Sequence, residues 1–493
     1  MSPELHAFWQ RLSSHAKQHP HQLALWGEDH SLDYAALMAE IALRRQQLRD
    51  ADSKVVGLAL DNGPEALVWD LAILFEGLAC VMLPPFFSIS QQQHCLEQSQ
   101  ADTVIAESET SHTLQDAGFE LRGEFWRRSA AARPGMPEGT AKLTFTSGTT
   151  GTPKGVCLSA DSVLTVAREL YQASLPNQPA HHLSLLPLAI LLENIGCYAA
   201  LYAGATVSLP SQRLLGIQGA SGVDAPRLLA CLHERQPHSM ILVPQLLLLL
   251  VNACEMGMFN PATLRFVAVG GARVSLELLL RAQAAAIPVF EGYGLSECAS
   301  VVALNRPSAH RPGSVGKPLP HVRIQLAEDG EVLIGGAPML GYLGDTQAPA
   351  SWWPTGDLGT FDAEGYLYLK GRKKHQFVTS FGRNVNPEWV EAELALSGRI
   401  AQAFVYGEAM PHNHALIWPA RADISDAQLQ ADIDQANQNL PDYAQVHHWT
   451  RLEQPFSAAN GMATANGRPR REAILTHYFH LFTPANRTED FTS

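Results

Sequence analysis

Leu143-Thr-Phe-Thr-Ser-Gly-Thr-Thr-Gly-Thr-Pro-Lys-Gly-Val156 is the segment from which this chain of 493 residues is best understood. Ten of its positions, Thr146 to Gly155, hold five hydroxyl residues, three glycines and one lysine. Glycines let the backbone approach a ligand closely, successive N–H groups in a turn bind anions, and a lysine adds a mobile positive charge. The apolar residues at the start of the segment predict a strand that leads into it. We therefore predict a loop that holds a polyphosphate.

The spacing within this loop differs from that of the common P-loop, which needs a lysine directly after its second glycine. Here Pro153 and Thr152 separate Gly151 from Lys154. A solvent-exposed loop without a ligand is the alternative, because clusters of Gly, Ser and Thr are typical of loops.

The segment nevertheless resembles the phosphate-binding motif of the adenylate-forming superfamily, which includes acyl-CoA synthetases, luciferases and the adenylation domains of peptide synthetases. Residues 146–155 match every fixed position of that family's pattern, Thr-Ser-Gly-Thr-Thr-Gly-x-Pro-Lys-Gly. The resemblance implies a catalytic role for Lys154. It also implies that the nucleotide is bound by Thr146, Ser147, Gly148, Thr149, Thr150 and Gly151.

The net charge, the cysteine spacing and the apolar runs of the sequence argue against several classes of protein. The formal charge of −13 argues against nucleic acid as a partner, because phosphate backbones need a basic face. Seven cysteines are scattered singly, with no Cys-x-x-Cys pair, so their spacing predicts neither a zinc site nor disulfides. No signal peptide is apparent, and the most apolar run, residues 241–251, is too short to span a bilayer. We expect a cytoplasmic protein.

The order of predicted elements indicates an α/β fold. Strand and helix patterns alternate from residue 55 to residue 291, which favours parallel sheets. After about residue 310, short β-like runs predict a small β-rich subdomain. We expect an adenylation core over residues 1–371, which binds ATP and the acyl substrate, and a small mobile α+β domain over residues 372–493.

Two predicted strands end in glycine turns, where ligands sit in open parallel sheets. The first ends in Gly270-Gly271-Ala272, and the second continues as Gly292-Tyr293-Gly294-Leu295-Ser296-Glu297. A base could lie against such glycines with Tyr293 stacked on it, and a carboxylate such as Glu297 could hold Mg²⁺. The resemblance implies an adenine site built from Gly271, Ala272, Gly292, Tyr293, Gly294 and Ser296, with Glu297 as a catalytic metal ligand.

Later motifs extend the resemblance over nearly the whole chain. Thr355-Gly356-Asp357 matches the family's ribose-binding tripeptide, although a simple turn is the alternative for these residues alone. Arg372 is implied to contact ribose as well. The resemblance also implies that Lys374 is the hinge about which the small domain rotates, and that the loop at Gly382 approaches the thiol in the second half-reaction.

Two departures from the family pattern concern activity and specificity. Arg468 stands where the family has a catalytic lysine, and an arginine keeps the charge but not the compact ammonium group. Three outcomes stay open: Arg468 acts directly, Arg470 or Arg471 replaces it, or adenylation is slow. Ile190 replaces a histidine common in long-chain acyl-CoA synthetases. The family's layout implies an acyl pocket that includes Leu192, Asn194 and Val243.

The resemblance implies an acyl-CoA synthetase that uses ATP and Mg²⁺ to activate a fatty or other apolar acid and passes the acyl group to coenzyme A. A ligase that loads a phosphopantetheine carrier protein, in a secondary-metabolite or lipid pathway, is the first alternative. A nucleotide-binding homologue with weak or lost catalysis is the second, and Arg468 is its only support. The sequence names neither the acid nor an oligomeric state.

Overall fold

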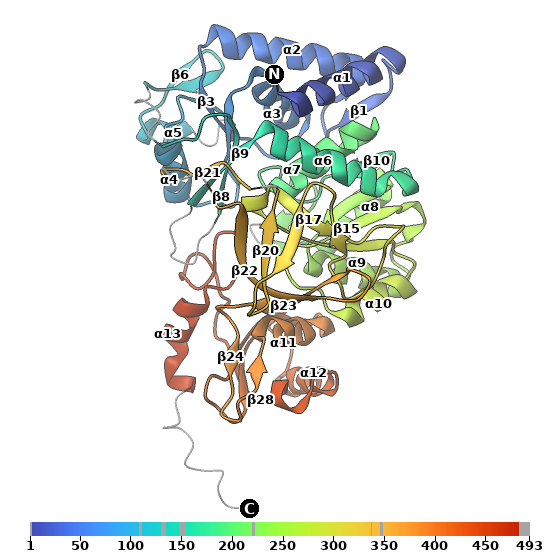
Figure 1. The fold of residues 1–493 in the computed structure, drawn as a ribbon, viewed down its shortest axis with the longest axis vertical. Helices are drawn as coiled ribbons and strands as arrows, with labels where there is room; N and C mark the ends of the chain where they lie inside the picture. Colours follow the sequence, from blue (N-terminus) through green and yellow to red (C-terminus); the bar gives the residue numbers. More distant parts are fainter. Residues whose placement is uncertain are drawn as a thin grey trace, which may run out of the picture.

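The computed structural model of the protein contains two large sheets, a four-stranded sheet and a carboxyl-terminal α+β unit (Figure 1). It describes residues 2–107, 111–129, 135–146, 154–218, 222–336, 338–345 and 349–482. In chain order the described α-helices are α1 (Pro3–Gln18), α2 (Tyr34–Asp50), α3 (Pro64–Glu76), α4 (Ile89–Ser99), α5 (Ser111–Asp116), α6 (Ala160–Ser174), α7 (Leu191–Ala203), α8 (Ala225–Arg235), α9 (Pro244–Glu255), α10 (Leu276–Ala284), α11 (Pro387–Leu394), α12 (Asp426–Gln438) and α13 (Arg471–Phe482). None of these helices is both long and apolar enough to cross a membrane.

Local sequence sets where several helices begin and end. The Asp33 carboxylate caps α2 by accepting from the N–H of Ala36 at 2.8 Å. Helix α3 begins with Pro64, whose missing N–H costs nothing at a first helical position, and ends before Gly77 at φ 74°. Helix α7 ends in the same way, at Gly204 with φ 75°. The apolar face of each helix is then free to pack on a sheet.

The first large sheet has a parallel centre with antiparallel edges. Its order is β18-β17-β16-β15-β14-β10-β11-β1-β2, and pairing is parallel from β16 to β1. The strands are β1 (Leu23–Trp26), β2 (Ser31–Asp33), β10 (His181–Leu183), β11 (Thr206–Ser208), β14 (Ser239–Leu242), β15 (Phe266–Val269), β16 (Val289–Leu295), β17 (Ser300–Leu304) and β18 (Lys317–Pro318).

The second large sheet carries the phosphate hairpin, in the order β21-β9-β8-β4-β3-β5-β7-β6. Its strands are β3 (Val55–Ala59), β4 (Ala79–Met82), β5 (Thr103–Ala106), β6 (Glu120–Arg122), β7 (Phe125–Arg127), β8 (Thr140–Thr146), β9 (Lys154–Ser159) and β21 (Gly341–Tyr342). Strands β8, β4, β3 and β5 run parallel. The largest apolar core joins residues of α1, α2, α3, α6 and α7 with residues of both sheets.

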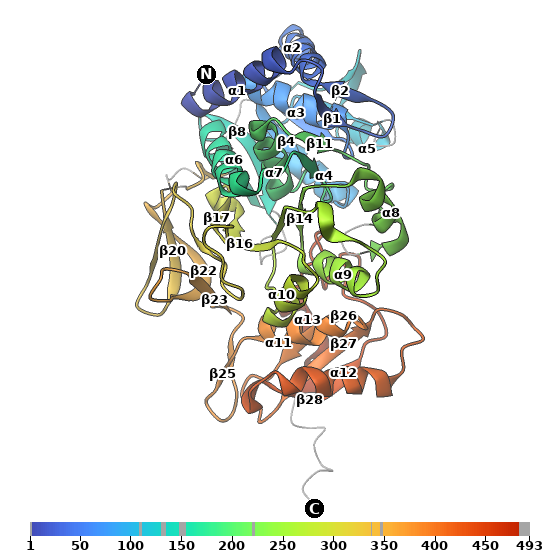
Figure 2. The same ribbon diagram turned by 90° about the vertical axis from the view of Figure 1, so that its right-hand side faces the viewer.

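Figure 2 shows the four-stranded sheet at one side of the molecule and the carboxyl-terminal unit at its lower end. A four-stranded antiparallel sheet contains β19 (Arg323–Leu326), β20 (Glu331–Gly335), β22 (Trp352–Phe361) and β23 (Leu367–Arg372). The carboxyl-terminal unit has its own apolar core and a sheet of β26 (Ile400–Tyr406), β27 (Asn413–Pro419) and β28 (Val446–Arg451). Two short pairs complete the described strands: β12 (Ile217–Gln218) with β13 (Gly222–Val223), and β24 (Phe377–Val378) with β25 (Asn384–Val385).

The α/β fold expected from the sequence is confirmed, but some local expectations are wrong. The strand predicted to end before Gly292 continues through both glycines to Leu295. Asp357 does not follow a turn; it lies inside the long strand β22. In each case a neighbouring strand pairs with the glycine-containing segment, and local sequence does not reveal that pairing.

Candidate active site

The phosphate hairpin brings two predicted residues to its open end. Strands β8 and β9 pair antiparallel, with Thr146 opposite Lys154, and the Thr146 hydroxyl donates to the Lys154 carbonyl at 3.5 Å. Lys154 begins β9 with an exposed side chain. The connecting segment lies outside the described residues; it carries the predicted Ser147, Gly148, Thr149, Thr150 and Gly151.

Tyr342 joins this hairpin to Glu297, a connection that the sequence did not reveal. Its hydroxyl donates to Glu297 Oε1 at 2.9 Å, and the Nζ atom of Lys154 lies 5.4 Å from its ring centre. Strand β21 places it there by pairing with β9. Burial, followed by the nearby Glu297 carboxylate, raises the pKa of Tyr342, so it remains a neutral donor. A lone Gly-Tyr pair is too common in sequences to have indicated this role.

A second cluster contains Tyr293, Asp357 and Arg372. Asp357 Oδ2 accepts from the Tyr293 hydroxyl at 2.6 Å, and Oδ1 lies 2.7 Å from Arg372 Nε. The pairing of β22 with β23 sets Asp357 opposite Arg372. Burial raises the pKa of Asp357, while Arg372 acts in the opposite direction. The carboxylate is thus held from two sides and still has lone pairs for ribose hydroxyls.

The predicted adenine-site residues lie on β15 and β16 and the turns after them. Gly271 follows β15 at φ 81°, and Ala272 after it is exposed. Gly294 cannot carry a side chain, because a Cβ there would lie 1.9 Å from the Ser300 carbonyl oxygen. A Cβ on Gly292 would lie 3.0 Å from a Leu304 methyl carbon. Packing of β16 on β17 therefore accounts for both glycines.

Ser296 and Glu297 follow β16 in a short 3₁₀ turn, Ser296–Cys298. Glu297 is half-buried, and its carbonyl accepts from the Met339 N–H at 2.7 Å. This backbone bond ties the turn to the segment that leads into β21. The Glu297 carboxylate is fixed from that segment as well as by its own turn.

Arg468 reaches the same site from the carboxyl-terminal unit. Its Nη2 atom donates to the carbonyl of Gly271 at 3.1 Å. Desolvation and then Arg372 lower the pKa of Arg468, and the carboxylates of Asp357 and Glu297 oppose them. The side chain retains contact with solvent. A cation from a second structural unit thus faces the carboxylates of the large unit.

The two alternative arginines near Arg468 differ in their surroundings. Arg471 is a largely buried residue whose Nη1 donates to Glu391 Oε1 at 2.7 Å. It also donates to the Val405 carbonyl at 2.5 Å, so it fastens α13 to β26. Arg470 is half-buried, one residue before α13. Arg471 is therefore engaged within the carboxyl-terminal unit, whereas Arg468 points out of it.

Lys374 and Gly382 lie where the chain enters the carboxyl-terminal unit. Lys374 is exposed in the turn after β23, and the next residue, His375, places Nδ1 2.6 Å from Glu388 Oε1 on α11. Gly382 adopts φ 70° in the turn between β24 and β25. The neighbouring Phe381 is 73% exposed.

The residues predicted to form an acyl pocket have unlike environments. Leu192 on α7 is half-buried and packs against two apolar cores. Val243 precedes α9 and lies 3.8 Å from a Cβ placed on Gly271. Asn194 is fully buried instead, and its amide donates to Asp70 Oδ2 at 2.8 Å.

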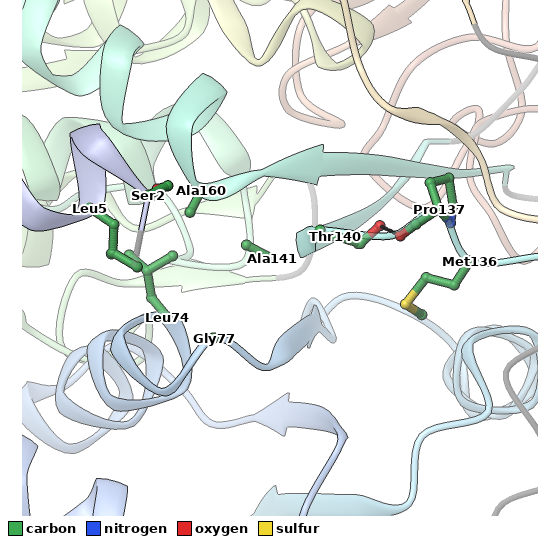
Figure 3. Close-up of a pocket in the computed structure, with 10 residues that line it drawn as sticks. Ser2, Leu5, Leu74, Gly77, Met136, Pro137, Thr140, Ala141 and Ala160 are labelled. Carbon is green, nitrogen blue, oxygen red and sulfur yellow. Dashed lines mark hydrogen bonds between the residues drawn. The ribbon is translucent and has the colours of Figure 1, made fainter.

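A cavity of about 230 Å³ lies elsewhere, at the Thr140 end of β8 (Figure 3). Leu5, Leu74, Met136 and Ala160 are among its mostly apolar lining residues. None of the predicted site residues lines it. We therefore place the candidate site around Lys154, Glu297, Asp357 and Arg468 on the basis of their chemistry.

Comparison with known families finds a match over most of the chain. Residues 12–343 match the family described as AMP-binding enzyme, and residues 374–483 match the AMP-binding enzyme C-terminal domain. Strands β22 and β23 lie between the two matched ranges, and Lys374 is the first residue of the second range.

Curated relatives are similar over most of the chain. A long-chain-fatty-acid–CoA ligase, FadD15 of Mycobacterium bovis, is 26% identical over 88% of this chain and 89% of its own length. A 2-succinylbenzoate–CoA ligase of Enterococcus faecalis is 25% identical over 96% of this chain and 99% of its own length. Among solved structures, o-succinylbenzoate coenzyme A synthetase of Bacillus subtilis, in complex with ATP and magnesium ion, superposes with a TM-score of 0.72 at 23% identity, covering 94% of this chain and 98% of that chain.

Proposed function

The chain belongs to the AMP-binding enzyme family, and we propose that it is an AMP-forming acid–thiol ligase. In the first half-reaction a carboxylic acid attacks the α-phosphate of ATP, giving an acyl-adenylate and pyrophosphate. In the second, the thiol of coenzyme A takes the acyl group and releases AMP. The observation that carries this proposal is that the charge of Arg468 acts on both Asp357 and Glu297, while Tyr342 links Glu297 to Lys154; these residues come from distant segments and two structural units.

Charge neutralisation and positioning are the tasks of this site, as in other phosphoryl transfers. Lys154 offsets phosphate charge, and Arg468 faces the α-phosphate and the attacking carboxylate. Asp357, oriented by Tyr293 and Arg372, accepts the ribose hydroxyls. Thr146 brings a hydroxyl to the end of β8, next to Lys154.

Glu297 is the residue that fits Mg²⁺, because a half-buried carboxylate held by the Tyr342 hydroxyl offers the oxygen ligands this ion prefers. When bound, Mg²⁺ supplies positive charge to the phosphates of ATP. Tyr342 orients the carboxylate that holds the ion.

We propose an apolar acid, fatty or aromatic, as the substrate. Ile190, Leu192 and Val243 are half-buried at the ends of α7 and α9 and offer no charge to pair with a polar acid. Two relatives are named for a long-chain fatty acid and for 2-succinylbenzoate, so alkyl and aryl acids are the two classes to compare. The second carboxylate of 2-succinylbenzoate finds no charged partner among Ile190, Leu192 and Val243, which favours a monocarboxylic acid for this chain.

The test is carboxylate-dependent pyrophosphate release, measured over acids from acetate to palmitate, benzoates, 2-succinylbenzoate and amino acids, with and without coenzyme A. Release with one class of apolar acid, increased by coenzyme A, is the expected result. Release that coenzyme A does not increase would identify a carrier protein as the acceptor. ATP binding without release for any acid would overturn the enzyme proposal and favour a homologue without catalysis.

A further inference from the structure

Three residues with metal-binding side chains meet in the interior, between β10 and α7. His182 comes from β10, and Glu193 and Cys197 come from successive turns of α7. All three are buried, with the His182 and Glu193 side chains 5% and 0% exposed. A ligand atom from each lies within 4.8 Å of those from the other two. Within the described residues, no other such trio is found.

Two of the polar atoms at this point, one from Glu193 and one from His182, lack hydrogen-bond partners among the described residues. Glu193 Oε2 accepts from the Leu186 N–H at 3.3 Å, but Oε1 has no hydrogen bond. His182 Nδ1 lies 3.1 Å from the Ser239 hydroxyl, but Nε2 has no hydrogen bond. Most buried polar side-chain atoms have a hydrogen-bond partner, so these two atoms require an explanation.

The distance between the two atoms separates the possible explanations. Glu193 Oε1 and His182 Nε2 are 3.4 Å apart. A charge-assisted N–H···O bond closes to about 2.7–2.9 Å. Two ligands on neighbouring corners of a tetrahedral zinc site, with bonds of about 2.0–2.3 Å, lie roughly 3.3–3.7 Å apart. The observed distance fits the edge of a zinc tetrahedron and is longer than a charge-assisted hydrogen bond.

We propose that His182, Glu193 and Cys197 bind one divalent transition metal ion, with zinc as the best chemical match. Nitrogen, oxygen and thiolate donors together are typical of zinc ligands. A neutral imidazole, one carboxylate and one thiolate cancel the charge of a divalent ion, which suits a fully buried position. Ser239 fixes the ring so that Nε2 faces the ion, as hydrogen-bonded partners of histidine ligands commonly do.

The proposed ion has a structural role. It joins β10 to α7, whose first residues, Leu191 and Leu192, lie at the proposed acyl end of the site. The residues at the nucleotide, Lys154, Glu297 and Asp357, are not ligands. The spacing of the cysteines could not predict this site, because its three ligands are of different residue types and come from two elements.

The experiment uses the full chain, stripped of metal with a chelator and then titrated with Zn²⁺ or Co²⁺. We expect one ion per chain by elemental analysis, a higher thermal midpoint with Zn²⁺, and a thiolate-to-cobalt charge-transfer band with Co²⁺. Cys197→Ser should abolish the band and weaken metal binding by about tenfold or more. Cys231→Ser, at a buried cysteine of α8 outside the cluster, is the matched control and should change neither.

Ser239→Ala gives a second readout that leaves all three ligands in place. It should weaken zinc binding by about 10–100-fold through the loss of ring orientation. No zinc uptake by the parent protein, or equal uptake by the parent and Cys197→Ser, would overturn the proposal and leave a buried His182–Glu193 ion pair. Because metal content is measured directly, the result is independent of whether the protein proves to be a ligase.

Discussion

The candidate site has two parts that differ in whether their charged side chains are already paired with one another. On the proposed ribose side, Tyr293 and Arg372 both contact Asp357 within the large unit, so the carboxylate is oriented before any ligand arrives. On the proposed phosphate side, Lys154 is exposed, and Arg468 comes from the carboxyl-terminal unit and bonds to a backbone carbonyl. Because neither Lys154 nor Arg468 forms an ion pair with a carboxylate of the described residues, both can interact with negative charge on the substrate. We therefore expect changes on the phosphate side to slow chemistry and changes on the ribose side to weaken binding.

The largest expected effect is that of Arg468→Ala. It removes the cation that faces the developing charge, so the rate of acyl-adenylate formation should fall by about 10²–10³-fold. Arg468→Lys should restore most of the rate, because an ammonium keeps the charge. Pyrophosphate release in the first turnover is the measurement.

Arg470→Ala is the matched control for this comparison. If Arg470→Ala slowed adenylation as much as Arg468→Ala, Arg468 would not be the one arginine that adenylation needs, and Arg470 would have to be included in the catalytic role. Arg471 is a poor control, since its removal would leave Glu391 unpaired.

Lys374→Pro tests whether the two sides must separate between half-reactions. Proline fixes φ and restricts the residue before it, so rotation about this turn should be blocked. We expect adenylation to persist and the transfer of a preformed acyl group to coenzyme A to fall by at least about tenfold. Both half-reactions are measured separately. Equal impairment of the two would show that Lys374 is not a hinge.

Asp357→Asn tests the ribose side. The amide loses the ionic contact with Arg372 and accepts ribose hydroxyls less well, so KM for ATP should rise by about tenfold with a smaller change in kcat. Tyr293→Phe, which deletes a single bond to the same carboxylate, should give a smaller change in the same direction. A fall in kcat at unchanged KM would contradict the division between the two sides.

Glu291 on β16 and Asp357 on β22 are both buried carboxylates. They differ in that Glu291 Oε2 has no hydrogen-bond partner in the described part of the chain. Burial raises its pKa from 4.5 to about 8, although Arg273 opposes the shift. Between about pH 4.5 and 8, the Glu291 carboxyl therefore stays protonated in the folded protein and is ionised in the unfolded chain. The contribution of Glu291 to the free energy of unfolding should therefore fall across this range as pH rises, by on the order of a few kcal/mol.

Glu291→Gln keeps the shape and removes the titration. Its unfolding free energy, measured by denaturant titration, should depend less on pH between about pH 4.5 and 8 than that of the parent protein. Identical pH profiles for the two proteins would show that Glu291 does not titrate in this range.

The sequence predicted local features of the candidate site better than its strand pairing. Thr146 ends the strand that was expected to lead into the phosphate loop, but the return strand β9, which sets Lys154 opposite Thr146, was not expected. Thr355-Gly356-Asp357 was found as a motif, but its place inside β22 was not, because the pairing with β23 is not encoded locally.

Contacts between distant segments could not be predicted in the same way. Tyr342 meets Glu297 only because β21 is added to the edge of the second large sheet beside β9. Asn194 is directed toward Asp70, more than a hundred residues away, so its sequence neighbours gave no sign that it would be buried. The alternation of strands and helices fixed the fold class, whereas the order of strands in the two sheets depends on tertiary packing.

Tyr342→Phe should have the smallest effect and is the finest test of the phosphate side. The ring stays beside Lys154, and only the hydroxyl that donates to Glu297 is lost. Since one neutral donor to a carboxylate is worth about 1.5–3 kcal/mol at most and solvent reaches this site, we expect a change of about three- to tenfold. If Tyr342 orients the carboxylate that holds Mg²⁺, the change should appear as a higher Mg²⁺ concentration for half-maximal pyrophosphate release. A uniform fall in rate at every Mg²⁺ concentration would instead assign the hydroxyl to the packing of β21 on β9.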